Sequence, residues 1–435
     1  MLISSKIHDG ISGNINIPGD KSISHRSIII SSISNGSCEV SNLLFSEDVI
    51  HTLNAFVSMG VKIEQFKDKI IIEGRGLNSL QKPLHNIYLG NSGTSARLLT
   101  GLLASQNFNT VLTGDKSLSK RPMKRITDPL KTMGGKFESQ NNTLPLKIYG
   151  NKLNATEYEL PIPSAQVKSG ILFAALNTKG KTKILENNIS RDHTEIMLKS
   201  FGANIECTKI NDKSQIIISG ESELFPKDIS IPSDLSSAAF FIIAALINKN
   251  SSIKLENINI NPTRDGILRS LKLMGASINV YNKRTVNDEV VADLKVQSSK
   301  LRGCELDEKM SRLMIDEYPI LSIAASFAET PSLFKGLKEL KFKESNRLEL
   351  IRINLDRCGV ECSVSEDQLF INPKNRSAVK NNLIQTNFDH RIAMSFAVMG
   401  SKLDTNLKIT DSDSIKTSFP NFIENYNQVG GNLIE

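Results

Sequence analysis

A short pattern that recurs six times constrains the fold of this chain more than any other feature of its sequence. The pattern is an apolar residue, a glycine, a small residue, a variable residue and a second apolar residue. Its copies follow one another about every 70 residues, at 59–63, 133–137, 201–205, 274–278, 358–362 and 429–433. One match would arise by chance, but six matches at nearly even spacing indicate a structural unit that is repeated six times.

Each copy of the pattern has the same surroundings. A segment with helical periodicity precedes the glycine, as in 192–201, where Ile196, Met197 and Phe201 share one face. The glycine suits the left-handed backbone position that ends a helix, where a side chain would clash. Strands of alternating apolar residues often follow, as at 215–219. Helix, glycine, strand and hairpin strand together predict a small α/β module.

The sixth copy stops at the last residue, so its hairpin partner has to come from another part of the chain. The N-terminal segments 2–7 and 13–17 have strand-like patterns and are the candidates. We therefore expect an α/β (α+β) fold in two domains of three units each. Residues 1–18 plus 233–435 form a discontinuous domain, and residues 19–232 form an inserted domain. Such a joint allows hinge closure, which expels water from a cleft between the domains.

The composition is that of a globular protein, with 39% hydrophobic and 23% charged residues. No apolar run approaches the roughly 20 residues of a membrane span, and the N-terminus has no leader pattern, so we expect a cytoplasmic protein without a membrane partner. The net charge of +7 arises from 53 basic and 46 acidic residues, without Trp or a basic cluster, so no nucleic-acid partner is expected. Five cysteines without metal-ligand spacing predict reduced thiols and no metal site.

Segment 18–26 is the first of several polar segments that the predicted modules place at helix starts. It leaves a strand, turns at a glycine and enters a helix at Asp20 or Ser22, so backbone amides point out of a helix N-terminus. Lys21 and Arg26 add positive charge, which suits a phosphate or a carboxylate. The alternative is an ordinary capped helix with two solvated basic residues, and this segment alone does not decide between them.

Similar segments occur in both halves of the chain. They place small, hydroxyl-bearing, basic or proline residues at predicted helix starts, at 89–97, 120–123, 161–170, 191–193, 316–319, 343–347 and 389–391. In the first of these, Gly93 permits close approach of a ligand to the backbone. Glu344 and Arg347 are i,i+3 neighbours, and the alternative for them is a surface ion pair of little consequence. Because the segments recur at equivalent ends of symmetric modules, we expect them to converge on one cleft.

Nine short runs resemble, in order and spacing, the motifs of the 5-enolpyruvylshikimate-3-phosphate synthase family, and the resemblance extends from about residue 19 to residue 420. The runs are 19–26, 90–94, 120–123, 164–166, 234–239, 261–264, 343–347, 389–394 and 418–420. The resemblance implies the enolpyruvyl transferase fold, with six βαβαββ-type units, three in each domain, and the active site in the interdomain cleft. This agrees with the architecture predicted from the repeats.

The resemblance also implies a reaction. The enolpyruvyl group of phosphoenolpyruvate is transferred to the 5-hydroxyl of shikimate 3-phosphate, and phosphate is released, by addition and elimination through a tetrahedral intermediate. The two small-molecule substrates are the expected partners. No metal and no organic cofactor takes part, and a monomer is expected.

The resemblance assigns site residues position by position. The expected contacts of phosphoenolpyruvate are Lys21, Gly93, Arg121, Gln166, Arg347 and Arg391. Those of shikimate 3-phosphate are Lys21, Ser22, Arg26, Ser164, Ala165, Gln166, Arg191, Asp316 and Lys343. Arginine suits both anions because its planar guanidinium forms paired hydrogen bonds with carboxylate and phosphate.

The reaction needs a group that takes the hydroxyl proton and a group that protonates and then deprotonates the methylene carbon. The candidates are Asp316, Glu344 and Lys21. We expect Asp316 to act at the hydroxyl and Glu344 at the methylene, although the sequence leaves the assignment open.

The sequence departs from the family pattern at one place. Many relatives have a lysine directly before the final Thr-Phe-Pro, which is Ser418-Phe419-Pro420 here, and Thr417 stands at the position of that lysine. Lys416 is one position away, so the sequence leaves open which residue makes this phosphate contact. At Gly93 the chain keeps the residue that some glyphosate-insensitive members replace by alanine. Gly93→Ala is therefore expected to raise the inhibition constant of glyphosate.

Three alternative functions differ from this one in features that can be checked. The related transferase that acts on UDP-N-acetylglucosamine uses a cysteine in the loop matching 114–121, where this chain has none. Segment 175–182 fits a loose P-loop pattern of nucleotide hydrolases, but an apolar helical run precedes it and a strand-like run follows, the reverse of the order that a phosphate loop needs. A non-enzymatic binding protein of the same fold would tolerate replacement of Lys21 or Arg121.

Overall fold

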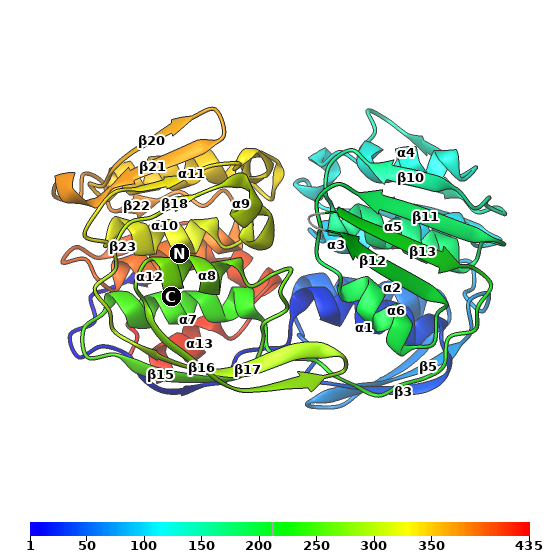
Figure 1. Ribbon diagram of the computed structural model, residues 1–435, viewed down its shortest axis with the longest axis horizontal. Helices are drawn as coiled ribbons and strands as arrows, with labels where there is room; N and C mark the ends of the chain where they lie inside the picture. Colours follow the sequence, from blue (N-terminus) through cyan, green and yellow to red (C-terminus); the bar gives the residue numbers. More distant parts are fainter. Residues whose placement is uncertain (211–212) are drawn as a thin grey trace. The chain divides into compact units, whose positions relative to one another are not determined.

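The computed structural model describes residues 1–210 and 213–435. These residues form two compact units (Figure 1). Unit 1 comprises Met1–Pro18, Pro232–Thr285 and Val290–Glu435, and unit 2 comprises Gly19–Ile231 and Val286–Glu289. Their ends lie next to the predicted domain boundaries. That the two units are separate domains joined by a hinge stays a prediction.

The described residues contain six four-stranded sheets, three in each unit, and the sheets share one topology. The strand order of β6-β7-β9-β8 is typical: the first two strands are parallel, and the last strand of the module lies antiparallel between the second and the third. Two helices connect the first three strands, which gives the order βαβαββ. The fold class predicted from the six repeats is confirmed.

In unit 2 the first module contains α1 (Lys21–Ile33), β3 (Asn35–Ser41), α2 (Glu47–Ser58), β4 (Lys62–Gln65), β5 (Lys69–Arg75) and β14 (Ile229–Ser230). The second contains β6 (Ile87–Tyr88), α3 (Gly93–Ala104), β7 (Asn109–Thr113), α4 (Lys124–Thr132), β8 (Lys136–Ser139) and β9 (Leu146–Tyr149). The third contains β10 (Glu157–Leu160), α5 (Ala165–Leu176), β11 (Lys181–Glu186), α6 (His193–Ser200), β12 (Ile205–Ile210) and β13 (Lys213–Ser219).

In unit 1 the first module contains β2 (Ser12–Ile15), α7 (Leu235–Ile247), β15 (Ser252–Asn259), α8 (Gly266–Leu273), β16 (Ser277–Val286) and β17 (Glu289–Gln297). The second contains β18 (Glu305–Leu306), α9 (Glu308–Met314), α10 (Tyr318–Ser326), β19 (Ser332–Phe334), α11 (Arg347–Arg357), β20 (Glu361–Ser365) and β21 (Gln368–Asn372). The third contains β22 (Leu383–Ile384), α12 (His390–Gly400), β23 (Leu407–Ile409), α13 (Phe422–Gln428), β24 (Leu433–Ile434) and β1 (Leu2–Ser4).

The glycine of each repeat lies between the last helix of its module and the strand that follows, and it has a positive φ, between 77° and 103°, which a side chain would disfavour. These glycines are Gly60, Gly134, Gly202, Gly275, Gly359 and Gly430. The left-handed helix stop predicted from the repeat is therefore confirmed in all six copies.

Three modules take one strand from a distant part of the chain. In the sixth module β1 pairs antiparallel with β24, with Ile3 opposite Ile434, so the N-terminal segment supplies the predicted hairpin partner. The second N-terminal strand, β2, pairs parallel with β15 in another sheet of unit 1. In unit 2, β14 at the end of the insert pairs parallel with β3. These pairings join the N-terminal segment to the rest of unit 1, and they join the two ends of the insert, 19–231, to each other in unit 2.

Each unit has its own apolar core. In unit 1 helices α7, α10 and α12, one from each module, pack against one another. Every residue of α7 is buried, as expected for a helix that is apolar on all sides. In unit 2, α3 and α5 pack together, and β11 and β13 pack on α5, which lies behind their sheet in Figure 1.

No helix among the described residues is long and apolar enough to cross a membrane. Those residues also contain no group of three or more His, Cys, Asp or Glu side chains arranged to hold a metal ion. The five cysteines are free thiols: Cys38 and Cys358 are buried, Cys304 and Cys362 are half-buried, and Cys207 is exposed.

Candidate active site

The first set of predicted site residues lies at helix starts in unit 2. Asp20 caps α1, and its carboxylate accepts a hydrogen bond from the amide of Ile23 at 3.0 Å. Lys21 opens the helix, and its ammonium lies 2.5 Å from a carboxylate oxygen of Asp48 at the start of α2. The predicted cation is therefore held by a carboxylate, whose role the sequence did not reveal because 27 positions separate the two residues.

Arg26 is buried and ties three helices together. Its Nε donates to the hydroxyl of Thr194 on α6 at 2.6 Å, and Nη2 donates to the hydroxyl of Ser169 on α5 at 2.8 Å. Nη1 donates to the carbonyl oxygen of Ser22, one turn earlier, at 2.9 Å. One guanidinium thus connects the half-buried Ser22 with Ser169 on α5 and Thr194 on α6.

Gly93 is the first residue of α3, which Ser92 caps. A Cβ atom at Gly93 would lie 2.8 Å from Nη1 of Arg97 and 3.0 Å from Nη1 of Arg121. The structure therefore brings Gly93 and Arg121 together, as the sequence led us to expect. Arg121 precedes α4 and donates from Nη2 to the side-chain oxygen of Asn91.

The start of α5 adjoins the start of α3. Nη1 of Arg97 donates to the carbonyl oxygen of Gly93 at 3.1 Å and to Oε1 of Gln166 at 2.9 Å, while Nε2 of Gln166 donates to the hydroxyl of Thr94 at 3.0 Å. Ser164 caps α5, with Ala165 as its first residue. Arg97 had no role in the sequence prediction, and the available signal was its position one turn after Gly93.

The close packing of α3 on α5 explains why these contacts form. A Cβ atom on Gly101 would lie 1.9 Å from the carbonyl oxygen of Gly170, so only glycine fits where the two helices approach. Arg97 and Gln166 stand one turn before these glycines and therefore meet across the same contact.

Arg191 is half-buried and precedes α6, next to a buried ion cluster. Lys168 on α5 lies 2.9 Å from Glu186 and 2.7 Å from Glu195, and its side chain is 1% exposed. Its ammonium also donates to the carbonyl oxygen of Ser190 at 3.4 Å. Burial lowers the pKa of Lys168, but the neighbouring carboxylates outweigh it and raise the pKa above its usual value, so this lysine is charged. The cluster fixes the backbone directly before Arg191.

The second set of site residues lies in unit 1 around Arg347, whose side chain is 1% exposed. Nε donates to Asp389 at 2.8 Å, Nη1 to Asp316 at 3.2 Å, and Nη2 to Glu344. Burial lowers the pKa of Arg347, but these carboxylates outweigh it and hold the pKa above its usual value. The two expected acid–base residues thus contact one guanidinium. The Glu344–Arg347 pair belongs to a buried network and is not an isolated surface pair.

Lys343 and Arg391 complete the second set. The ammonium of Lys343 lies 3.0 Å from the same carboxylate oxygen of Asp316 that Arg347 contacts. Arg391, in the first turn of α12, donates from Nη1 to the backbone carbonyl of Asp316 at 3.0 Å. Asp316 is therefore surrounded by three cations in unit 1.

Lys416 and Thr417, the two candidates for the phosphate contact that the sequence did not assign, lie before α13. Lys416 lies 3.3 Å from Asp413 in an exposed pair, and the hydroxyl of Thr417 lies 3.4 Å from Nδ1 of His390. Which of them contacts phosphate stays a prediction.

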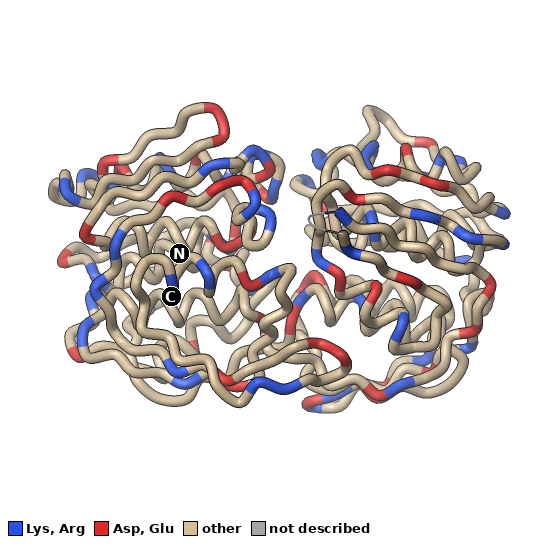
Figure 2. Tube along the Cα trace, in the orientation of Figure 1, with Lys and Arg blue, Asp and Glu red and all other residues tan. Residues whose placement is uncertain are grey.

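Basic and acidic residues are interspersed along the trace of each unit (Figure 2). In the second set three cations, Lys343, Arg347 and Arg391, stand near four carboxylates, Asp316, Glu317, Glu344 and Asp389. The net charge of +7 is thus not concentrated there, and the charge of these side chains is largely neutralised before any anion binds.

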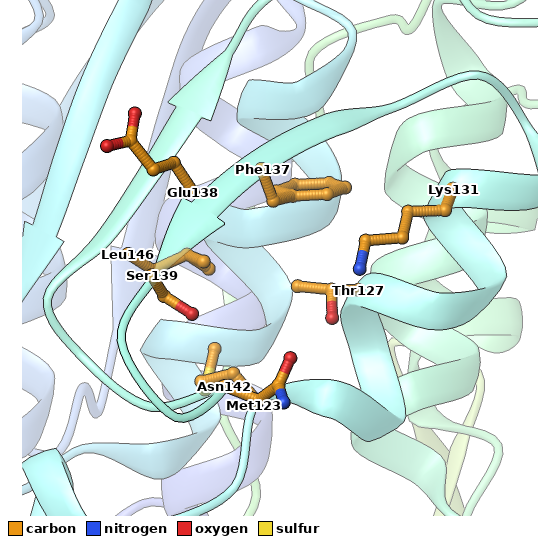
Figure 3. A pocket seen from close by; sticks show the side chains of 8 residues that line it. All are labelled: Met123, Thr127, Lys131, Phe137, Glu138, Ser139, Asn142 and Leu146. Atoms are coloured by element: carbon orange, nitrogen blue, oxygen red, sulfur yellow. The ribbon is translucent and has the colours of Figure 1, made fainter.

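A cavity of about 300 Å³ lies elsewhere in unit 2, between α4 and the β8–β9 hairpin. Thr127 and Lys131 of α4 face Phe137 of β8 across it, while the carboxylate of Glu138 points away from them (Figure 3). None of the predicted site residues lines this cavity, and the carboxylates and cations needed for the chemistry are not among its lining residues.

The P-loop alternative is wrong in its structural context. Helix α5 ends at Leu176, Gly180 makes a turn with φ of 103°, and β11 begins at Lys181. The segment is thus a helix-to-strand turn, as its sequence pattern predicts, and it presents no helix N-terminus to a phosphate.

The six-sheet architecture is that of an enolpyruvyl transferase. The chain is similar to the enolpyruvyl transferase NikO of Streptomyces tendae with a TM-score of 0.78, over 100% of this chain and 98% of that one. The sequence identity is 15%, so this likeness concerns the fold.

The chain belongs to the EPSP synthase (3-phosphoshikimate 1-carboxyvinyltransferase) family, whose model matches residues 6–426. The 3-phosphoshikimate 1-carboxyvinyltransferase of Ruthia magnifica subsp. Calyptogena magnifica is 46% identical over 98% of this chain and 97% of that protein. That of Coxiella burnetii (strain CbuK_Q154) is 44% identical, covering 98% and 96%. An EPSP synthase structure from Acinetobacter baumannii has a TM-score of 0.87 at 40% identity, covering 100% and 99%. The family predicted from the motifs is confirmed.

Proposed function

We propose that this enzyme transfers the enolpyruvyl group of phosphoenolpyruvate to the 5-hydroxyl of shikimate 3-phosphate, the reaction of its family in the shikimate pathway. The observation that carries the proposal is the contact of Asp316 and Glu344 with one buried guanidinium, Arg347. An arginine that recognises an anion and two carboxylates that exchange protons are what this addition and elimination requires.

Phosphoenolpyruvate is bound, in this proposal, by residues from both sets: Lys21, Gly93, Arg121, Gln166, Arg347 and Arg391. The position of Gly93 supports it, because a Cβ atom there would lie 3.0 Å from Nη1 of Arg121, so a side chain would crowd a ligand bound by this guanidinium. Shikimate 3-phosphate is bound by Lys21, Ser22, Arg26, Ser164, Ala165, Gln166, Arg191, Asp316 and Lys343. Several of these residues lie where backbone amides of a helix start favour anions. They are Lys21 and Ser22 in the first turn of α1, and Ser164, Ala165 and Gln166 at the cap and first turn of α5, while Arg191 directly precedes the cap of α6.

The chemistry then follows in two steps. Asp316 takes the proton of the 5-hydroxyl, whose oxygen bonds to C2 of phosphoenolpyruvate while Glu344 delivers a proton to C3. In the second step Glu344 removes a proton from C3, the bond between C2 and the phosphate oxygen breaks, and phosphate leaves. Lys21 stabilises the negative charge of both substrates, and its contact with Asp48 orients it. We further propose that the enzyme is a cytoplasmic monomer that uses no cofactor.

The experiment is phosphate release from phosphoenolpyruvate with and without shikimate 3-phosphate, in EDTA, followed by the same assay in D2O. Release that depends on shikimate 3-phosphate supports the function, and its absence from folded enzyme overturns it. Glu344→Gln should slow deuterium exchange into the methylene group by about 100-fold or more. The control is Glu349→Gln, which removes only a partly exposed surface pair with Arg352 and should leave exchange unchanged. Wild-type exchange in Glu344→Gln would remove Glu344 from the mechanism.

A further inference from the structure

Glu317 is a buried carboxylate next to the proposed base, and the proposed reaction does not use it. It follows Asp316 and precedes α10, and its side chain is 1% exposed. A buried carboxylate is costly unless a cation or hydrogen-bond donors compensate it. Its Oε1 lies 3.6 Å from Nη1 of Arg391 and accepts a hydrogen bond from the hydroxyl of Ser236. Its Oε2 has no hydrogen-bond partner among the described residues.

The hydroxyl of Ser236 is itself oriented from behind. Nη2 of Arg264 donates to this hydroxyl oxygen at 2.8 Å and to Oδ1 of Asp234 at 2.9 Å. The amide of Ser236 donates to the same oxygen of Asp234 at 2.8 Å, which caps α7. Because the hydroxyl oxygen accepts from Arg264, its single proton points to Glu317. Asp234, Ser236 and Arg264 belong to the motifs 234–239 and 261–264, which had no assigned role. They form one buried hydrogen-bond network that ends at Glu317.

Arg391 is the cation that Glu317 contacts beyond this hydrogen-bond network. Its Nη1 is held between the carboxylate of Glu317 and the backbone carbonyl of Asp316, the latter at 3.0 Å. Within the described residues its Nη2 and Nε make no hydrogen bond, and the side chain is 13% exposed. Arg347 differs, since three carboxylates occupy all three of its nitrogens. Arg391 is therefore anchored on one side only.

We propose that Glu317 is a positioning residue for Arg391, a role that rests on the proposed function. The carboxylate fixes Nη1, so the remaining two nitrogens keep the orientation in which they pair with an anionic group of phosphoenolpyruvate. Without it, Arg391 samples other rotamers and the bound anion loses a preformed partner. Since this contact exists in the ground state as well as in the transition state, its loss raises KM and leaves kcat nearly unchanged.

The test is steady-state phosphate release by Glu317→Gln, which keeps the shape and an acceptor for Ser236 but removes the charge. The KM for phosphoenolpyruvate should rise about tenfold, with kcat and the KM for shikimate 3-phosphate within about twofold of wild type. Ser236→Ala, which only loosens Glu317, should raise the same KM by less. Glu349→Gln is the matched loss of a carboxylate from a surface pair with Arg352 and should change neither constant.

A double-mutant cycle with Arg391→Gln separates positioning from general damage to the fold. If Glu317 acts through Arg391, adding Glu317→Gln to Arg391→Gln changes the KM for phosphoenolpyruvate by less than about twofold. An unchanged KM in the single variant, an equal loss of kcat, or a full additional loss in the double variant would overturn the proposal. If Glu317→Gln does not fold, the same comparison of single and double variants is made with Ser236→Ala in its place. A wild-type enzyme inactive with both substrates would instead refute the proposed function.

Discussion

At the scale of single residues, Phe388 has a backbone conformation that a bulky side chain rarely adopts. Its φ is 59°, after Asn387 at 49°, in a turn closed by the amide of Asp389 donating to the carbonyl of Thr386 at 3.0 Å. Non-glycine residues in the left-handed region cost about 1–2 kcal/mol, and asparagine tolerates it best. Phe388 is 68% exposed and so gains little from burial. The turn leads directly into Asp389, the cap of α12.

Phe388→Asn should therefore raise the free energy of unfolding by about 1 kcal/mol, measured by urea denaturation. Phe370→Asn is the control, because Phe370 is also an exposed phenylalanine, 37% exposed, but lies in β21 with ordinary strand geometry. That variant should lose stability. Equal losses in the two variants would show that the conformation of Phe388 carries no strain.

Gly93→Ala is the second prediction at this scale. The added methyl group would lie 2.8 Å from Arg97 and 3.0 Å from Arg121, so both guanidinium groups must shift. Overpacking of this kind costs about 1–3 kcal/mol, which corresponds to a rise of about fivefold to 150-fold in the inhibition constant of glyphosate. The constant is measured by competition with phosphoenolpyruvate. An unchanged inhibition constant would mean that Gly93 does not border the site.

At the scale of elements, Lys168 joins α5, α6 and the end of β11 through Glu195 and Glu186. Lys168→Met would leave two carboxylates buried without their cation, which typically costs about 3–5 kcal/mol. Thermal and urea unfolding should both show the loss. Lys62→Met is the control, because Lys62 also contacts two carboxylates, at 2.6 and 2.9 Å, but is 55% exposed, so its loss should change stability by less than about 1 kcal/mol. Similar small effects in both variants would contradict this account of the cluster.

His25 links α1, α2 and α3 through hydroxyl groups. Its Nδ1 lies 2.7 Å from the hydroxyl of Thr52, which lies 2.5 Å from that of Ser95, and Ser95 contacts the cap residue Ser92 at 2.6 Å. Burial, with further contributions from Lys21 and Arg26, lowers the pKa of His25 well below its usual value, although Asp20 opposes the shift. The imidazole is therefore neutral in the folded enzyme at neutral pH.

This neutral histidine predicts a pH dependence of stability. The unfolded chain binds a proton below about pH 6.5, whereas the folded chain resists it until the pH is lower, so His25 reduces the stability of the fold as the pH falls through that window. The slope is about 1.4 kcal/mol per pH unit. His25→Asn keeps a partner for Thr52 without the titration, and urea unfolding at pH 7.5 and 5.5 should show a smaller loss than in wild type. Parallel losses would show that His25 is protonated equally in both states.

At the scale of the whole molecule, most of the architecture was predictable because the repeated sequence pattern depends on local backbone geometry. A glycine such as Gly202 is required by its left-handed φ, and that requirement is visible in the sequence itself. Helix-start residues such as Lys21 and Gly93 were predictable for the same reason, since capping patterns are local.

The supporting contacts could not be predicted in this way. Asp48, Arg97, Lys168 and Glu317 act through partners that are distant in the sequence or belong to another element, and whether each is buried depends on packing between elements. Arg97 and Gln166 meet only because Gly101 and Gly170 bring α3 and α5 together. A single sequence does not specify such packing. The assignment of each proton transfer to Asp316, Glu344 or Lys21 remains a prediction.

The central claim, that this enzyme joins phosphoenolpyruvate to shikimate 3-phosphate, is tested most directly by a competition between acceptors. The enzyme is mixed with phosphoenolpyruvate and equal concentrations of shikimate 3-phosphate and UDP-N-acetylglucosamine, and the products are identified by mass spectrometry. We predict that the enolpyruvyl group is found on shikimate 3-phosphate alone, with one phosphate released for each product. Enolpyruvyl transfer to the UDP-sugar, or phosphate release without any enolpyruvyl product, would contradict the account.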